Sequence, residues 1–309
     1  MIRPRLLFIL NQSIGDVILT TGVIAAVIRQ YDDPRVTIVC AGVTAPLFQH
    51  VPEVEEIITI RRKKFSGHWF EIWPRLSRTR WTRIVDFRRT ALSRVLRGPV
   101  SYPDRGPTRP HKVVEMSSVL GRDAVPASPI LVFGPGHPTP KTGRTLVLGP
   151  GASSLYKTWP AERFGEAATR LTGPDGVLAG ARVIVTGGPM DQAAARTIAD
   201  HVGVDRTVDL TGADLMATAD AMHGADLFMG NDSGMTHLSA AAGAPTLALF
   251  GPTDDSLYRP WGDRARIVSA PREEPRGETA EPSDDDAVMR ALSVDRVVAA
   301  AEVFIRDIK

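Results

Sequence analysis

The residues best suited to chemistry stand in the second half of the chain, directly after an apolar run typical of a buried strand. This segment reads Asn231-Asp232-Ser233-Gly234, and His237 follows one helical turn later. Backbone amides and a hydroxyl at a helix start would form a nest for a diphosphate, and the imidazole could donate to the same anion. A histidine there is often a buried structural residue, and the aspartate could cap the helix or bind sugar hydroxyls. An anion site is the better interpretation.

A second candidate follows the expected strand 145–148. Small residues would let main-chain amides approach phosphate oxygens, Ser153 and Ser154 add hydroxyl donors, and Lys157 adds a positive charge. Pro160 suits the first position of a helix. The spacing differs from that of a P-loop, and a plain loop remains an alternative. The residue types favour an anion site.

Two further segments carry a carboxylate at a helix start. Asp191 follows a strand and a glycine pair, where it could cap the helix or accept from a ribose hydroxyl. Ser13, Gly15 and Asp16 follow the first strand. Asp16 or Ser13 could cap that helix, or Asp16 could be a general base with its polar neighbours positioning an acceptor. The residues alone leave these alternatives open.

The elements that must position these residues alternate along the chain, as is typical of parallel sheets with crossover helices. The expected strands cover residues 5–10, 36–40, 56–60, 83–87, 145–148, 182–186, 207–210, 227–230 and 246–250. The expected helices cover residues 15–30, 68–78, 90–97, 111–120, 160–171, 191–202, 214–223, 234–242 and 294–307.

A Pro- and Gly-rich passage at 134–140 divides this pattern. We therefore expect an α/β protein of two doubly wound domains, residues 1–136 and 141–290, facing a central cleft. A C-terminal helix within 291–309 could pack back on the first domain. Ligands in open α/β sheets bind beyond the carboxyl ends of the strands, which is where the candidate segments fall.

Composition limits the remaining classes of function. The net charge of +2 over 309 residues gives no overall field that demands nucleic acid. One cysteine, Cys40, excludes an internal disulfide, and no segment has the length of a membrane span. Metal-binding spacings are absent from the sequence. Cations nevertheless crowd one stretch, which is either a solvated basic face or a site for an anionic partner: Arg61, Arg62, Lys63, Lys64, Arg75, Arg78, Arg80, Arg83, Arg88, Arg89, Arg94 and Arg97.

Taken together, these segments resemble glycosyltransferase family nine, the ADP-heptose:lipopolysaccharide heptosyltransferases. The resemblance is carried by Gly15-Asp16-Val17-Ile18-Leu19-Thr20-Thr21, Gly151-Ala152-Ser153 through Lys157-Thr158-Trp159-Pro160, Gly187-Gly188-Pro189, Asn231 through Leu238, and Phe250-Gly251-Pro252-Thr253-Asp254. It covers nearly the whole chain in order. It implies a GT-B fold of two Rossmann-like domains, with the donor bound mainly by the second.

The resemblance also implies roles for individual residues in an inverting, metal-independent transfer of heptose, with ADP-heptose as donor substrate and no cofactor. Asp16 would be the catalytic base. The donor-binding residues would be Ser153, Ser154, Lys157, Asp191, Ala213 (by its backbone, at the adenine), Asp232, Ser233, Gly234 and His237. The acceptor-binding residues would be Ser13, Gly15, Arg61, Arg62, Lys63 and Arg88.

The family's acceptor, the lipid A–Kdo part of the lipopolysaccharide core, is anionic and lipid-linked, which gives the cationic stretch a purpose. We accordingly expect a cytoplasmic protein in peripheral contact with the inner face of the inner membrane, and no nucleic-acid partner. Two alternatives remain. One is a GT-B glycosyltransferase that uses another nucleotide sugar or acts on another surface glycan. The other is a non-catalytic nucleotide-binding protein of the same fold, against which the presence of both Asp16 and Lys157 weighs.

Overall fold

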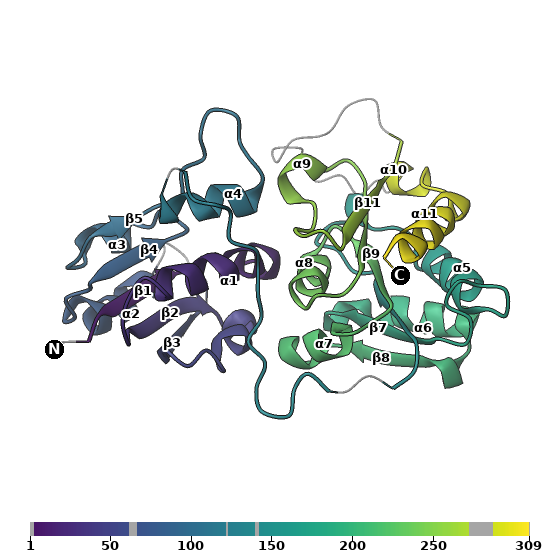
Figure 1. Ribbon diagram of the computed structural model, residues 1–309, viewed down its shortest axis with the longest axis horizontal. Coiled ribbons are helices and arrows are strands. Elements are labelled where there is room, and N and C mark those ends of the chain that lie inside the picture. Colours follow the sequence, from purple (N-terminus) through teal and green to yellow (C-terminus); the bar gives the residue numbers. More distant parts are fainter. Residues whose placement is uncertain (1–2, 62–66, 122, 140–141, 272–286, 309) are drawn as a thin grey trace. The chain divides into compact units, whose positions relative to one another are not determined.

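A computed structural model describes residues 3–61, 67–121, 123–139, 142–271 and 287–308 (Figure 1). The chain divides into two compact units, Met1–Gly134 and Pro135–Lys309. Each unit contains a parallel sheet joined by helices, so the predicted α/β class with two doubly wound domains is confirmed. Within the described residues, no helix combines the length and apolar character needed to cross a membrane.

The first unit is built on a five-stranded sheet in the order β3-β2-β1-β4-β5. Its strands are β1 (Arg5–Ile9), β2 (Arg35–Ala41), β3 (Val54–Ile60), β4 (Arg83–Asp86) and β5 (Val100–Ser101). Its helices are α1 (Ile14–Ile28), α2 (His68–Ser77), α3 (Ala91–Val95) and α4 (Lys112–Ser117), with 3-10 helices at Gly42–Phe48 and Ser118–Leu120. The winding direction reverses between β1 and β4, which makes that junction the switch point of the sheet.

Strand periodicity assigns the two faces of this sheet. Leu7 and Ile9 of β1 belong to the core that also contains Ile72 of α2 and Leu92 of α3. Side chains alternate along a strand, so the equally buried Phe8 points to the opposite face. Burial on both faces explains why the strands are apolar runs and were readily predicted.

The second unit is built on a six-stranded parallel sheet in the order β11-β10-β9-β6-β7-β8. Its strands are β6 (Thr145–Gly149), β7 (Arg182–Gly187), β8 (Thr207–Thr211), β9 (Leu227–Asn231), β10 (Thr246–Phe250) and β11 (Ala265–Ser269). Its helices are α5 (Ala161–Thr172), α6 (Gln192–Val202), α7 (Leu215–Met222), α8 (Gly234–Ala241), α9 (Asp255–Tyr258), α10 (Ala287–Arg290) and α11 (Val294–Asp307), with 3-10 helices at Leu155–Lys157, Pro189–Asp191 and Val204–Arg206. Here the switch point lies between β6 and β9.

The C-terminal helix α11 packs within the second unit, against α5. Its apolar residues Val297, Ala301 and Phe304 are buried in the same core as Phe164 of α5. The apolar face is therefore accounted for by the second unit. The expectation that this helix packs back on the first domain stays a prediction.

The start of the second unit is attached to α7 through one carboxylate. Asp220 accepts hydrogen bonds from the amide and the hydroxyl of Thr139, both at 2.6 Å, and His137 Nδ1 lies 3.2 Å away. Burial acts to raise the pKa of Asp220, but the bonds from Thr139 and the partner His137 outweigh it, so the pKa lies below its ordinary value. The ionised carboxylate therefore stabilises the folded state.

We predict that Asp220→Ala lowers the free energy of unfolding by about 1–2 kcal/mol at pH 7, because two hydrogen bonds are lost. A carboxylate with a lowered pKa contributes stability above the pKa of the unfolded chain, about 4, and loses it as the pH falls through the folded value. Urea denaturation should thus show the difference from the wild type shrinking as the pH falls below 4. A difference that stays constant with pH would contradict the assignment.

Candidate active site

The carboxyl ends of β6 and β9 lie side by side at the switch point of the second sheet, where Gly149 pairs with Gly230. Both positions require glycine because the ring of Phe228 lies beneath them. A Cβ atom at either position would come within 2.7 Å of Phe228 Cζ. This close pairing brings the loop 150–157 next to the loop 231–234.

Asn231 ties these two loops together. Its side chain is fully buried, its Oδ1 atom accepts from Trp159 N at 3.1 Å, and its Nδ2 atom donates to Pro150 O at 2.6 Å. The Thr236 hydroxyl donates to the main-chain carbonyl oxygen of Asn231 at 2.6 Å, which connects α8 to the same residue. Asn231 belongs to the segment that the sequence singled out, but no role was predicted for it. The available signal was an amide residue at the end of an otherwise apolar strand.

Two predicted donor-binding residues meet directly at this junction. Lys157 Nζ lies 2.9 Å from Asp232 Oδ2, with side-chain exposures of 18% and 8%. The Thr253 hydroxyl, from the loop after β10, donates to the same oxygen at 3.0 Å. The ammonium group is thus fixed at the carboxyl edge of the sheet. Thr253 is a further site residue, which belongs to a motif shared with the family but had no predicted role.

The entrance of α8 offers donors beside this ion pair. Ser233 is the N-cap in an extended conformation, and Gly234 begins the helix. The Ser233 Oγ atom is buried and has no hydrogen-bond partner among the described residues. A buried hydroxyl without a partner is costly unless a ligand or water satisfies it. His237 lies one turn into α8 and is 5% exposed. The geometry suits an anion.

The serines of the loop after β6 differ in their surroundings. Ser153 is exposed, while the Ser154 carbonyl accepts from Lys157 N at 3.1 Å and from the Thr158 hydroxyl at 3.0 Å. These bonds close the short 3-10 helix that carries Lys157. Ser154 therefore positions the lysine through its backbone, and the Ser153 hydroxyl faces solvent.

Asp191 is the N-cap residue of α6, but its side chain makes no capping hydrogen bond to that helix and instead closes the 3-10 helix before it. Its Oδ2 atom accepts from Gly188 N at 2.8 Å. Burial raises the pKa of Asp191, and the Gly188 hydrogen bond offsets part of that rise. The carboxylate also lies against the loop after β6, because a Cβ on Gly151 would come within 2.3 Å of Oδ2. Capping and ligand contact remain compatible.

The predicted donor-binding residues line one edge of the second sheet. They follow β9, β6, β7 and, for Ala213, β8, which are consecutive neighbours in the sheet. Three strand spacings amount to about 14 Å. An extended nucleoside diphosphate can span such a row, with the diphosphate at β6 and β9 and the base toward β8.

In the first unit, Asp16 lies in the first turn of α1 after β1. Ser13 is the N-cap: its Oγ atom accepts from Asp16 N at 3.2 Å and donates to Asp16 Oδ2 at 2.7 Å. The other carboxylate oxygen accepts no hydrogen bond within the described residues, and the side chain is half-buried. Close by in sequence, the buried Gln12 Nε2 has no described partner. Gly15 lies between these residues in the same turn. This turn offers an acceptor and a donor to a ligand.

Arg88 follows β4, the neighbour of β1, so it lies at the same switch point as Asp16. The turn is shaped by the buried Asp86, which accepts from Arg88 N at 2.9 Å and from Thr90 N at 2.6 Å. The Arg88 guanidinium lies 5.2 Å from the ring centre of Trp69. Arg61 follows β3 and is exposed, and Arg62 and Lys63 lie outside the described residues.

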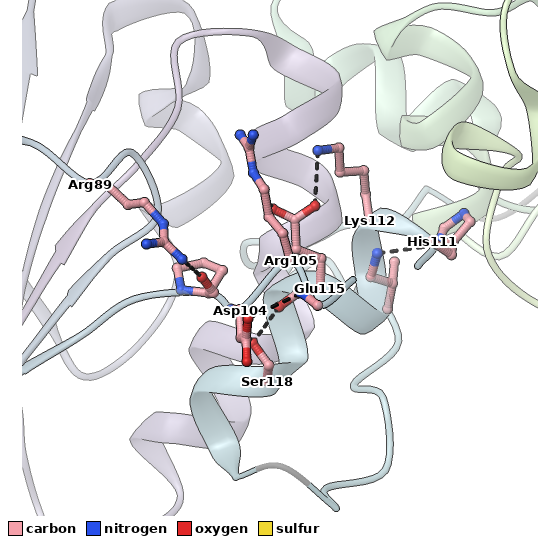
Figure 2. Close-up of polar contacts among 10 residues, drawn as sticks. Arg89, Asp104, Arg105, His111, Lys112, Glu115 and Ser118 are labelled. Atoms are coloured by element: carbon pink, nitrogen blue, oxygen red, sulfur yellow. Dashed lines mark hydrogen bonds and ion pairs between the residues drawn. The ribbon is translucent and has the colours of Figure 1, made fainter. Parts of the chain in front are cut away.

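Further cations follow β5, beyond the stretch that the sequence analysis identified. Figure 2 shows Lys112 and Arg105 beside one carboxylate, Glu115, at 3.0 Å and 3.3 Å. Glu115 and Lys112 are nearly buried, whereas the Arg105 side chain is 63% exposed. Arg89 is oriented by a bond to the carbonyl of Pro103. The carboxyl edge of the first sheet is therefore cationic after three of its strands.

Metal ligation has no candidate in the described part of the chain, where no group of three or more His, Cys, Asp or Glu side chains is arranged to hold an ion. The charges described at the β6–β9 junction are those of Lys157 and Asp232, with the amides of the α8 entrance beside them.

Comparisons with known proteins identify a family. Residues 122–285 match the family model of glycosyltransferase family 9 (heptosyltransferase). Lipopolysaccharide heptosyltransferase 3 of Escherichia coli is 25% identical over 291 residues, which cover 81% of this chain and 84% of that protein. Lipopolysaccharide heptosyltransferase 1 of Escherichia coli K12 is 29% identical over 120 residues, covering 38% of this chain and 35% of its own.

Solved structures resemble the whole chain. A glycosyl transferase family 9 protein from Veillonella parvula aligns with a TM-score of 0.78 at 18% identity, covering 98% of this chain and 97% of its own. The Escherichia coli ADP-heptose lps heptosyltransferase II aligns at 0.77, and Escherichia coli heptosyltransferase WaaC with ADP at 0.76, both at 18% identity. The two alignments cover 98% and 97% of this chain, respectively, and each covers 99% of the other protein's chain. At this identity the likeness shows the fold, which is GT-B.

We predict that Asn231→Ala destabilises the second unit by about 2–4 kcal/mol, because Trp159 N and Pro150 O would be left buried without partners. Urea denaturation followed by tryptophan fluorescence measures the loss. The control is Gln192→Ala, which removes an exposed amide of the same unit and should change the free energy of unfolding by less than about 0.5 kcal/mol. Equal effects of the two substitutions would show that Asn231 does not hold the loops.

Proposed function

Because the chain belongs to glycosyltransferase family 9, the heptosyltransferase family, and is therefore a glycosyltransferase, we propose that it transfers a heptose from ADP-heptose to a lipopolysaccharide core acceptor with inversion at the anomeric carbon. The observation that carries the proposal is the group of donors at the β6–β9 switch point of the second unit. There Lys157, the unsatisfied Ser233 hydroxyl and the first amides of α8 converge.

The site suits a departing diphosphate. When the bond between the anomeric carbon and the phosphate oxygen breaks, negative charge grows on that oxygen. A lysine and helix N-terminal amides fixed in advance stabilise such charge without having to reorganise. His237 would donate to the same group. This set supplies the charge that a divalent metal supplies elsewhere, so we propose a reaction that needs neither metal nor cofactor.

The rest of the donor would lie along the same edge. Asp232 would accept from sugar hydroxyls, and its bond to Lys157 would orient the ammonium group. Asp191 would accept from the ribose, and the backbone at Ala213 would meet the adenine. Ser153 is exposed at the loop after β6, where its hydroxyl could reach the diphosphate or sugar. Ser154, which is half-buried in the same loop, would contribute mainly through its backbone.

Asp16 would act as the general base. Its Oδ2 atom is held by Ser13, which leaves Oδ1 to take the proton from the attacking hydroxyl of the acceptor. That hydroxyl then attacks the face opposite the diphosphate, which inverts the anomeric configuration. Gly15 permits close approach of the acceptor to the turn.

The acceptor would bind at the cationic carboxyl edge of the first sheet. Arg61 and Arg88 are the predicted contacts within the described residues, and Arg105 adds an exposed guanidinium after β5. Guanidinium groups match phosphate and carboxylate oxygens in geometry. We propose an anionic, lipid-linked saccharide met at the cytoplasmic face of a membrane.

The direct experiment is transfer from purified ADP-heptose to truncated lipopolysaccharide, read by mass spectrometry. The proposal expects a product heavier by one heptose. A parallel thermal-shift series with ADP, UDP and GDP tests the base. A clear preference for UDP or GDP would replace ADP-heptose with another donor, and nucleotide binding without any transfer would favour the non-catalytic alternative.

We predict that Asp16→Asn lowers turnover by about 100- to 10,000-fold, since a general base contributes on that scale, while leaving the dissociation constant for ADP unchanged. Steady-state transfer and calorimetry measure the two quantities. The control is Asp295→Asn, which alters an exposed aspartate in the first turn of α11 and should leave turnover intact. Full turnover in Asp16→Asn would remove this residue from the mechanism.

We predict that Lys157→Ala weakens ADP binding by about 10- to 100-fold, the effect of losing a charge-assisted hydrogen bond. It also leaves Asp232 without its cation, so the variant should unfold more easily. The double variant Lys157→Ala/Asp232→Asn should regain stability without regaining affinity. An unchanged dissociation constant in the single variant would refute the assignment of Lys157 to the diphosphate.

A further inference from the structure

Helix α2 of the first unit has two apolar faces, of which one is exposed. Ile72 and Leu76 are buried in the core beneath it. Phe70 and Trp73, three residues apart on the outer side, are 80% and 45% exposed. Residues at this spacing are neighbours on a helix surface. Single exposed apolar residues are ordinary, but two adjacent aromatic side chains form a surface that water solvates poorly.

Cations border this surface, which we call the α2 face. It consists of Phe70 and Trp73 together with Arg75, Arg78 and Arg80, all of which are exposed. Helix α3, which contacts α2, adds the exposed residues Arg94 and Val95.

Acidic residues are scarce on and around the α2 face. Between positions 61 and 97 the sequence contains Glu71 and Asp86 as its acidic residues. Asp86 is fully buried and accepts three hydrogen bonds from its own turn. Glu56 of β3 forms an ion pair with Arg75. The exposed Glu71 of α2 and this ion pair offset part of the positive charge. The exposed Arg78, Arg80 and Arg94 leave the surroundings of the aromatic residues cationic.

We propose that the α2 face docks the protein on an anionic phospholipid surface. Aromatic side chains on the outer face of a helix bury their rings at the boundary of headgroups and acyl chains, and neighbouring arginines attract anionic headgroups. Both components are required, because either one alone gives weak, reversible binding. A second copy of the chain is disfavoured as occupant, since a symmetric contact through this face would set arginines against arginines.

The first turn of α2, which leads to Phe70, lies beside the carboxyl edge where the acceptor would bind. The first turn of α2 carries Trp69, and the Arg88 guanidinium lies over its ring at the carboxyl end of β4. That strand neighbours β1, which leads to Asp16. The inference deepens the proposed function, because it names the surface on which a lipid-linked acceptor would be met. Docking would present such an acceptor at the edge that holds the base.

The test is flotation of the purified full-length protein with vesicles, without donor or acceptor. The protein should float with vesicles of phosphatidylcholine and phosphatidylglycerol at low salt, and remain behind with phosphatidylcholine alone. Phe70→Ser/Trp73→Ser should reduce the floated fraction about tenfold, as expected when two aromatic anchors are removed. Arg75→Gln/Arg78→Gln should reduce it and flatten its dependence on salt.

The matched control is Val303→Ser, which removes an apolar side chain 56% exposed on α11 and should leave flotation unchanged. Light scattering must show the same mass for the wild type and the aromatic variant. A lower mass in the variant would identify the face as a contact between copies and overturn the proposal, as would flotation unaffected by these substitutions. Transfer to a short water-soluble acceptor separates membrane docking from the proposed function. A variant that loses flotation but still transfers has lost docking alone. A wild-type protein that floats but transfers nothing contradicts the proposed function and leaves docking intact.

Discussion

The ion pair between Lys157 and Asp232 is the interaction on which the second unit's site depends. It joins two loops that are 75 residues apart in sequence and adjacent at the switch point of the sheet. Both side chains are largely removed from water, so each charge needs the other while no ligand is present. The pair thereby keeps an ammonium group extended at the edge of the sheet. A nucleoside diphosphate would find a cation already in position.

The surrounding contacts explain how this pair can be held. Asn231 connects both loops through its amide, and Gly149 and Gly230 allow the strands to approach over Phe228. The α8 entrance then adds amides and the Ser233 hydroxyl on the same side. Preorganised donors of this kind act on charge that develops during the reaction, which is the main demand of glycosyl transfer from a diphosphate. In the proposed reaction, this preorganised part of the site would be the part that stabilises the leaving group.

Local patterns in the sequence predicted most elements, because buried parallel strands and amphipathic helices carry strong periodic signals. Helix α11 was predicted with its observed limits. The short strand β5 and the partly exposed edge strand β11 were missed, since neither has a continuous apolar run. The roles of Asn231 and Thr253 were not predicted, because these roles arise from tertiary contacts. The same holds for the packing of α11 on α5, which depends on a partner 120 or more residues away in sequence.

Hydrogen exchange read by mass spectrometry, with and without ADP, tests the central claim most directly. If the diphosphate binds at the β6–β9 junction, the amides of residues 150–158 and of 232–236 should exchange more slowly with ADP, because both loops and the α8 entrance would contact it. Peptides from α11 should be unaffected. Binding of ADP with no protection in either loop, or with protection confined to other segments, would contradict the account.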